Sequence, residues 1–154
     1  MIKKLERRKL HDFFKVRRAA KDEIFPKGTL YIQVSAVSHN DKDSAFKLTQ
    51  HCQTIESKYV VLEPIYAYSE GDIMYFYYML NSCYEAFFHK IIGEKINIAM
   101  SEFCDFEFDH LIYPQDREQF LRFCLIIENN IQAIENEIEQ MGKIKTYLLD
   151  QMFV

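Results

Sequence analysis

The sequence predicts an α+β protein in which one globular domain precedes a long C-terminal coiled-coil helix. Apolar side chains recur over residues 117–152 at alternating steps of three and four, the period of a coiled coil. Segments rich in β-branched and aromatic residues occur at 29–37 and 58–62, and a helical period follows at 69–88. We therefore expect a globular domain over residues 1–115 and a long helix over residues 116–154.

The composition fits a single folded domain. The 154 residues are 49% apolar, and only 4 Gly and 3 Pro occur, which is unlike a disordered or low-complexity chain. The four cysteines never form a CxxC pair, so we expect them to be reduced and buried in a cytoplasmic protein. No segment approaches the roughly 20 apolar residues that a membrane span requires, and we expect no membrane association.

The elements of the globular domain follow from local patterns. Residues 5–16 are compatible with a short helix or an extended entry segment. Alternation predicts a strand over 29–37 after a turn at 26–28, a polar loop over 38–44, and a second strand over 58–62 that Pro64 stops. Ser69 and Asp72 resemble a helix cap, so a helix begins near residue 70. Alternating phenylalanines predict a strand over 103–108, and Pro114 ends the domain.

The charge is distributed unevenly along the chain. Residues 1–27 hold ten basic and four acidic residues, a balance of +6, while the remainder holds nine basic and nineteen acidic residues, a balance of -10. Because phosphate contacts supply most sequence-independent affinity for DNA, the basic segment indicates an anionic partner, although a solvated basic face explains the charge equally well. The candidate phosphate contacts are the densest basic cluster, Lys15, Arg17, Arg18 and Lys21.

The polar loop carries further candidates for DNA contact, because groove-reading side chains are commonly displayed on loops. These are His39, Asn40 and Lys42, for which an ordinary surface loop is at least as probable. The tyrosine-rich stretch 75–78 has residues that can stack on bases, but its helical period favours a core role.

No catalytic constellation is present in the sequence. The histidines and cysteines lack metal-ligand spacing, and there is no GxSxG, glycine-rich phosphate loop or HExxH motif. Asp105, Glu107 and Asp109 alternate with phenylalanines, so a solvated strand face is more probable than an acid/base pair. We expect a non-enzyme without metal or cofactor.

The long helix is expected to pack against a partner. At about 1.5 Å per residue it spans roughly 50 Å, which is longer than a helix that only packs on the core of a domain of this size. A parallel pair would oppose Lys145 with its own copy, whereas an antiparallel pair centred near Asn136 brings Lys145 toward Glu128 of the other copy, so we expect an antiparallel homodimer. The seam that would form the interface contains Phe120, Cys124, Ile127, Ile131, Ile134, Ile138, Met141 and Leu148, and it continues to Met152.

The order of several segments resembles the specificity (S) subunits of type I restriction-modification systems. These segments are LHDFFKVRRAAKDE, GTLYIQVSAV, YVVLEP, DIMYFYYMLNS, GEKINIAMSEFCDFEF and YPQDREQF. The resemblance implies a target-recognition domain followed by a long helix. It also implies binding to double-stranded DNA and to a methyltransferase (modification) subunit, with methylation and cleavage performed by separate subunits.

Two departures from the family pattern bear on function. A full specificity subunit resembles two recognition domains and two long helices, whereas this chain has material for one of each, as in a half-subunit. The stretch 38–57 is also shorter than the family's central recognition region. Two functions are therefore expected: a DNA-specificity half-subunit, or a truncated relative that acts through its helical dimer as an interaction protein without reading DNA.

Overall fold

The computed structural model describes residues 4–33, 45–92 and 100–153. The chain divides into two compact units, a globular unit over Met1–Glu118 and a helical unit over Gln119–Val154. The fold is α+β, as the sequence predicts. No helix within the described ranges is long and apolar enough to cross a membrane.

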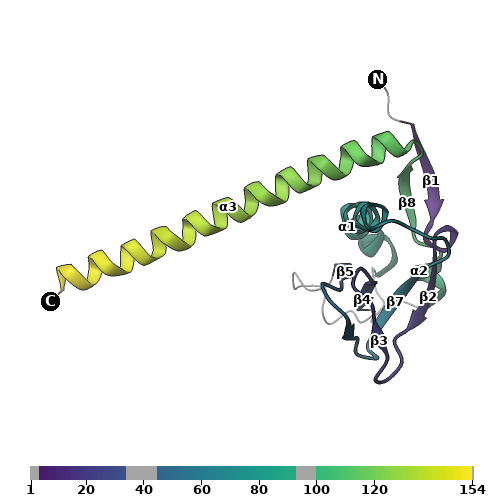
Figure 1. Cartoon of the computed structure of the whole chain (residues 1–154), viewed down its shortest axis with the longest axis horizontal. Coiled ribbons are helices and arrows are strands. Elements are labelled where there is room, and N and C mark those ends of the chain that lie inside the picture. The colour runs from purple at the N-terminus through teal and green to yellow at the C-terminus, as the bar shows by residue number, and fades with distance from the viewer. Residues whose placement is uncertain (1–3, 34–44, 93–99, 154) are drawn as a thin grey trace. The chain divides into compact units, whose positions relative to one another are not determined.

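The globular unit is built on a four-stranded antiparallel sheet with two short ribbons beside it (Figure 1). The strands of the sheet lie in the order β2 (Phe14–Arg18), β7 (Tyr59–Pro64), β4 (Leu30–Gln33) and β5 (Lys47–Leu48). The ribbons pair β1 (Leu5–Lys9) with β8 (Glu107–Leu111), and β3 (Ile24–Phe25) with β6 (Gln53–Thr54). Residues 5–16 therefore form two strands joined by the 3-10 turn Leu10–Asp12.

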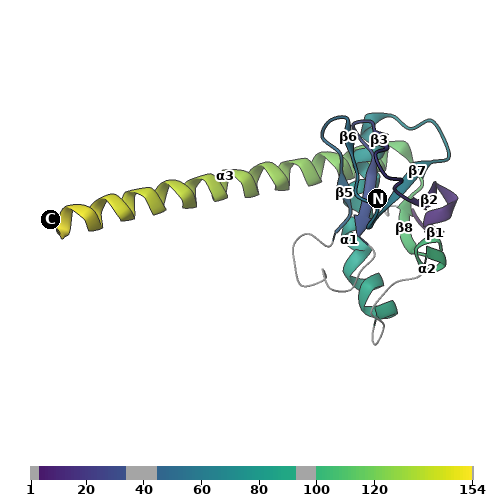
Figure 2. The ribbon, with the colours of Figure 1, turned by 90° about the horizontal axis from the view of Figure 1, so that it is seen from below.

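The main core lies between the sheet and the helix α1 (Glu70–Ile92), which runs beside the strands in Figure 2. Leu30 pairs with Leu62 in the strand register, and these side chains are almost fully buried on one face of the sheet. The ring of Phe76 on α1 meets that of Phe14 on β2 edge-on, with centroids 5.0 Å apart. Aromatic side chains in this geometry bury large apolar areas, so they fix α1 on the sheet.

A smaller core covers part of the opposite sheet face. Phe25 from β3 and Ile55, which follows β6, pack with Ala19 and Val61, all at most 4% exposed. Phe25 and Ile24 are neighbours on a strand, so their side chains point to opposite faces. The β3–β6 ribbon thus buries Phe25 and leaves Ile24 71% exposed.

The start of α1 confirms the expected cap. The Ser69 hydroxyl accepts a hydrogen bond from the Asp72 amide at 3.1 Å, and the Asp72 carboxylate accepts from the Ser69 amide at 3.0 Å. This reciprocal arrangement satisfies two backbone donors that a helix N-terminus otherwise leaves open. Tyr75 and Phe76 are buried on the helix, as a core role for this stretch requires.

Three local expectations are corrected. The predicted strand over 103–108 is instead the end of the helix α2 (Met100–Cys104) followed by β8, because the Phe106 amide bonds to the Phe103 carbonyl and turns the chain. β7 also continues through Pro64 rather than stopping before it, since proline is tolerated at the strand's last position. Finally, the cysteines are not buried: Cys52 is exposed and the other three are half-buried, although all four are free thiols.

The helix α3 (Pro114–Met152) begins at a proline, which suits the first helical position because the missing N–H would have no intrahelical acceptor there. Its first turn belongs to the globular unit. The Arg117 guanidinium donates to the carbonyls of Leu111 and Ile112 at 3.1 and 3.0 Å, and it lies 6.0 Å from the Tyr75 ring centroid. Arg117 therefore fastens this turn to the end of β8.

Candidate nucleic-acid interface

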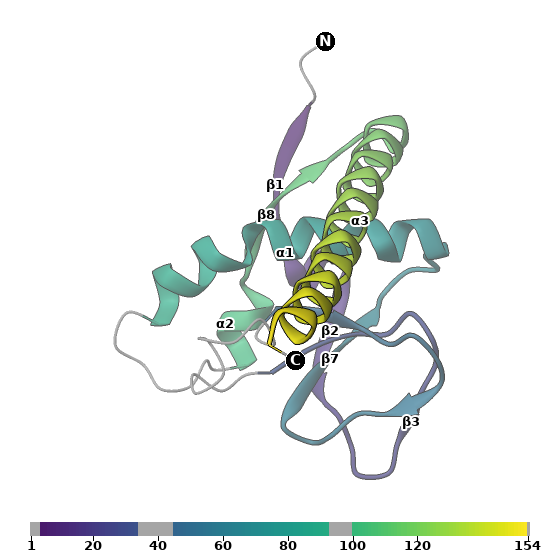
Figure 3. The same cartoon turned by 90° about the vertical axis from the view of Figure 1, so that its left-hand side faces the viewer.

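Much of the basic N-terminal segment is neutralised by carboxylates of the globular unit. In the strand register, Arg7 on β1 faces Asp109 on β8, and its guanidinium lies 3.1 Å from that carboxylate and 3.5 Å from Glu107. Figure 3 shows β1 and β8 side by side. The other ion pairs of this segment are Arg8 with Glu6 and Asp12, Lys9 with Asp105, Arg17 with Glu23 and Glu63, and Lys27 with Glu70.

These pairs account for the acidic residues near β8. Glu107 and Asp109 share one face of the strand, as the alternation predicts, while Asp105 precedes the strand and lies 3.3 Å from the Lys9 ammonium. Carboxylates that are paired with cations on an exposed ribbon serve as structural counter-charges. The geometry sets none of these three carboxylates apart as a general acid or a general base.

Among the candidate contacts that the structure describes, Arg17 is the most strongly held. Its Nε donates to Glu63 at 2.7 Å, while Nη1 and Nη2 donate to the two carboxylate oxygens of Glu23 at 2.8 and 2.5 Å. The hydrogen bonds that the Arg17 guanidinium donates to Glu23 raise the pKa of the guanidinium, and the same hydrogen bonds lower the pKa of the Glu23 carboxyl. The guanidinium also lies 5.5 Å from the Phe25 ring centroid. We refer to Arg17, Glu23 and Glu63 as the Arg17 clamp.

Lys15, Arg18 and Lys21 differ from Arg17 in having no carboxylate within 4 Å among the residues that the structure describes. All three are exposed. Lys15 points to the same face of β2 as Arg17, whereas Arg18 points to the other and Lys21 lies in the turn that follows. The candidates His39, Asn40 and Lys42 lie outside the described residues, so their expected contribution stays a prediction.

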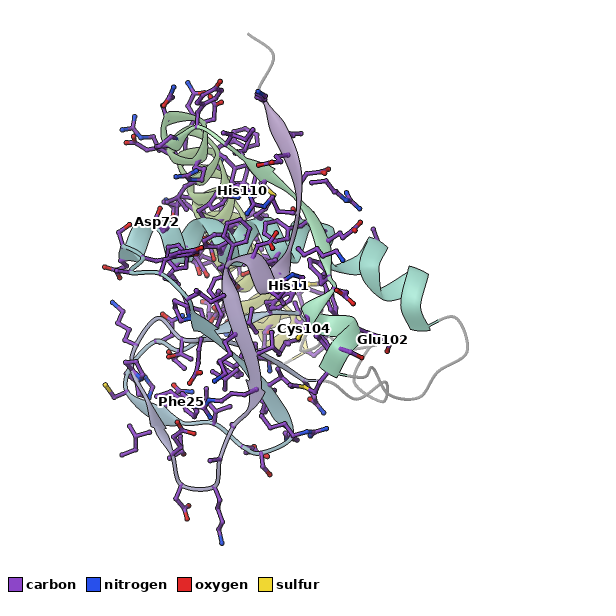
Figure 4. The ribbon with its side chains drawn as sticks, turned by 90° about the vertical axis from the view of Figure 1, so that its right-hand side faces the viewer. His11, Phe25, Asp72, Glu102, Cys104 and His110 are labelled. Carbon is purple, nitrogen blue, oxygen red and sulfur yellow. The ribbon has the colours of Figure 1, made fainter. Side chains whose placement is uncertain are left out.

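The histidines and cysteines form no group of metal-ligating side chains within the described ranges. His11 is half-exposed on the 3-10 turn, and its Nδ1 lies 2.9 Å from the Cys104 carbonyl oxygen. His110 is 9% exposed and belongs to the aromatic core (Figure 4). Its burial was not foreseen, although the pattern Phe106, Phe108, His110 places it on the apolar face of β8.

The seam of α3 is presented along the helical unit. Six of its eight predicted interface positions are between 42% and 68% exposed, and the remaining two, Phe120 and Cys124, are half-buried. Burial and the charge of Glu128 raise the pKa of the Cys124 thiol. Lys145 does not interrupt the apolar surface completely, because its stem lines a shallow groove with Met141, Ile144, Leu148 and Leu149.

Comparison with known proteins gives a structural match only. No protein-family model matches the sequence, and neither does any protein of curated function. The fold is similar to the crystal structure of a type I restriction-modification system S subunit from M. genitalium, with a TM-score of 0.65 and 13% sequence identity. The match covers 89% of this chain and 42% of the S subunit, so the chain spans less than half of that protein's length.

Proposed function

We propose that this chain is a DNA sequence-specificity half-subunit of a type I restriction-modification system. The observation that carries the proposal is the S-subunit-like fold, which extends over 89% of this chain but only 42% of the S subunit. In the proposal the globular unit binds duplex DNA, the helical unit pairs with a second copy, and the dimer positions separate methyltransferase and restriction subunits. The chain itself catalyses no reaction.

The pairing of the helical units is antiparallel in this proposal. An antiparallel arrangement centred at Asn136 opposes the seam residues with one another, for example Ile138 with Ile134 and Cys124 with Leu148 of the second copy, except that Ile127 falls opposite Lys145. Lys145 then lies near Glu128 of the second copy. A parallel arrangement would instead bring the two Lys145 ammonium groups together at a seam position. The exposed seam, which one helix cannot cover alone, supports the pairing.

A second candidate is an interaction protein that keeps the helical dimer but does not read DNA. The specific observation in its favour is that Arg7, Arg8, Lys9, Arg17 and Lys27 are all ion-paired within the chain. The basic segment therefore offers less free positive charge than its composition indicates, and the whole chain has a net charge of -4. This candidate would compete with a complete subunit for the same partners.

A titration with duplex DNA of mixed sequence separates the two candidates. The full chain is added to a fluorescent duplex at low and at moderate salt, and anisotropy reports binding. A DNA-binding half-subunit binds at low salt and loses affinity steeply as the salt concentration rises, because phosphate contacts release counterions. Absence of binding at low salt would exclude DNA reading by this chain and favour the interaction protein.

The symmetry of the recognised site tests the half-subunit geometry. Two identical globular units related by a two-fold axis recognise two identical half-sites in inverted repeat. Methylated positions are mapped in DNA from cells that express the chain with its modification subunit. The expected motif is palindromic and interrupted by a spacer, and an asymmetric or uninterrupted motif would contradict the proposed dimer even if the chain bound DNA.

A further inference from the structure

Residues 18–24, from the last residue of β2 to the first residue of β3, form a tight turn that projects from the globular unit (Figure 4). We call these residues the β2–β3 arm. Asp22 at its tip has φ 61°, a left-handed conformation that few side chains adopt, and the Glu23 amide bonds to the Ala20 carbonyl at 3.4 Å. The Glu23 carboxylate also accepts from the Ala20 amide at 3.3 Å. The arm thus closes on itself.

The Arg17 clamp fastens this arm to the sheet. Glu23 lies in the arm and Glu63 lies on β7, so the guanidinium between them joins the arm to β7. The three side chains are only 30–38% exposed, and a bidentate guanidinium–carboxylate pair fixes orientation as well as distance. At the base of the arm, the Ala19 amide bonds to the Tyr59 carbonyl at 3.2 Å. The arm is therefore held in one orientation.

The arm carries exposed positive charge and an exposed apolar side chain. Arg18 and Lys21 are exposed and have no carboxylate within 4 Å among the described residues. Ile24 is 71% exposed, although its neighbour Phe25 is buried. A single exposed isoleucine is ordinary on a protein surface. Because the arm is held in one orientation, the backbone position of Ile24 relative to Arg18 and Lys21 is fixed.

We propose that the β2–β3 arm enters a groove of duplex DNA, with Arg18 and Lys21 on backbone phosphates and Ile24 against an apolar base edge such as the thymine methyl group. The major groove is about 12 Å wide and admits an α-helix or a two-stranded β-ribbon, so a single closed turn such as this arm also fits within it. The inference rests on the proposed function. It assigns Arg17 a positioning role, since a guanidinium held by two carboxylates has little capacity left for a phosphate.

Salt-dependent binding tests the proposed interaction with phosphates. Affinity of the full chain for a mixed-sequence duplex is measured over a salt series for the wild type, Arg18→Ala and Lys21→Ala. Each variant should bind more weakly, and the slope of log K against log salt should become shallower by about 0.9 for each phosphate that the variant no longer neutralises. Lys27→Ala is the matched control, because Lys27 belongs to the same basic segment but is paired with Glu70 outside the arm.

Glu23→Ala distinguishes the arm from a diffuse positive surface. Removing a carboxylate makes the chain more positive, so a diffuse surface would bind DNA more tightly. If the clamped arm is the binding element, Glu23→Ala should bind several-fold more weakly. In a hydrogen-exchange measurement without DNA, the peptides of Glu23→Ala that cover residues 18–24 should also exchange faster than the same peptides of the wild type. Glu56→Ala removes another exposed carboxylate outside the arm and should leave affinity unchanged or slightly raised.

Ile24→Ser tests base contact. The wild type and the variant each select duplexes from a random pool by repeated capture, and Ile24→Ser should lose preference at a T·A pair with an unchanged salt slope on mixed duplex. Failure of the wild type to bind duplex would overturn the proposed function and this inference together. If the wild type binds with a steep salt slope but Arg18→Ala, Lys21→Ala and Glu23→Ala bind equally well, the inference alone is wrong.

Discussion

The hydroxyl of Tyr75 lies 3.2 Å from Nδ1 of His110 and joins α1 to β8 inside the aromatic core. The same oxygen accepts a hydrogen bond from the Leu111 amide at 3.0 Å. We therefore assign the hydroxyl proton to the Tyr75–His110 bond and the imidazole proton to Nε2. The His110 ring stacks on Phe76 with an interplanar angle of 8°. Burial, followed by the charges of Arg117 and Arg8, lowers the pKa of His110 to about 4.

His110 makes stability depend on pH. Because its pKa of about 4 in the fold lies below the ordinary value of 6.5, the unfolded chain binds the proton first as pH falls. The contribution of neutral His110 to stability is complete above pH 6.5 and is lost progressively toward pH 4. At pH 5 the loss is about 2 kcal/mol of unfolding free energy. Urea unfolding at pH 7.5 and pH 5 should show this loss in the wild type and not in His110→Gln. His11→Gln is the control, and equal pH dependence in all three proteins would contradict the assignment.

Tyr75→Phe tests the hydrogen bond directly. Removing the hydroxyl leaves the Leu111 amide and His110 Nδ1 without this partner in a buried site, which should cost about 1–3 kcal/mol of unfolding free energy. Urea unfolding at pH 7.5 measures the change. Tyr66→Phe removes an equivalent hydroxyl from a 62% exposed side chain and should change stability by less than about 0.5 kcal/mol. Similar losses of unfolding free energy in both variants would contradict the stabilising role assigned to the buried hydrogen bond.

The seam should hold the dimer. Replacing Ile131, Ile134 and Ile138 with Asp places six carboxylates in the proposed interface, so light scattering should report a monomer. The matched control changes Asn129, Asn136 and Gln140 to Asp on the opposite side of the helix, and that variant should remain dimeric. A folded dimer of unchanged mass for the seam variant would exclude this interface.

Cys124 reports the direction of pairing. In a background with Ser at positions 52, 83 and 104, Cys124 alone would cross-link a parallel dimer, because the same seam position then faces its own copy. In the antiparallel arrangement Cys124 faces Leu148, so only a Leu148→Cys variant of this background should form intermolecular disulfides rapidly. Oxidation is run at pH 9, because burial raises the pKa of the Cys124 thiol. Rapid cross-linking through Cys124 alone would establish parallel pairing.

Elements governed by local interactions were predictable from the sequence. The cap formed by Ser69 and Asp72 and the period of the following helix place the start of α1 correctly. The repeat of α3 likewise predicts one continuous helix, which the structure confirms. The expected strand at 103–108 was wrong because Phe103, Phe106 and Phe108 are all buried, from a helix, a turn and a strand in succession, and such a series imitates alternation.

Relationships between distant segments were not predictable in this way. β1 pairs with β8 from opposite ends of the globular unit, and only that register shows that Arg7 is neutralised by Asp109. Arg17 and Glu63 are likewise far apart in the chain, so the charge count does not show that the Arg17 guanidinium is held by carboxylates. The expected phosphate contact of Arg17 stays a prediction. The expected phosphate contacts of Lys15, Arg18 and Lys21 require that these side chains be exposed. The sequence suggests this exposure, but only the structure gives its extent.

The bare seam of α3 links the state of the helix to the amount of protein. An isolated helix gains little stability from its own turns, so order in the helical unit and association with a second copy belong to one equilibrium under the proposed pairing. In dilute solution the quantity of pairs grows with the square of the chain concentration. A modest fall in synthesis would therefore remove a disproportionate share of the pairs, and under the proposed function the abundance of the chain would set how much DNA is recognised.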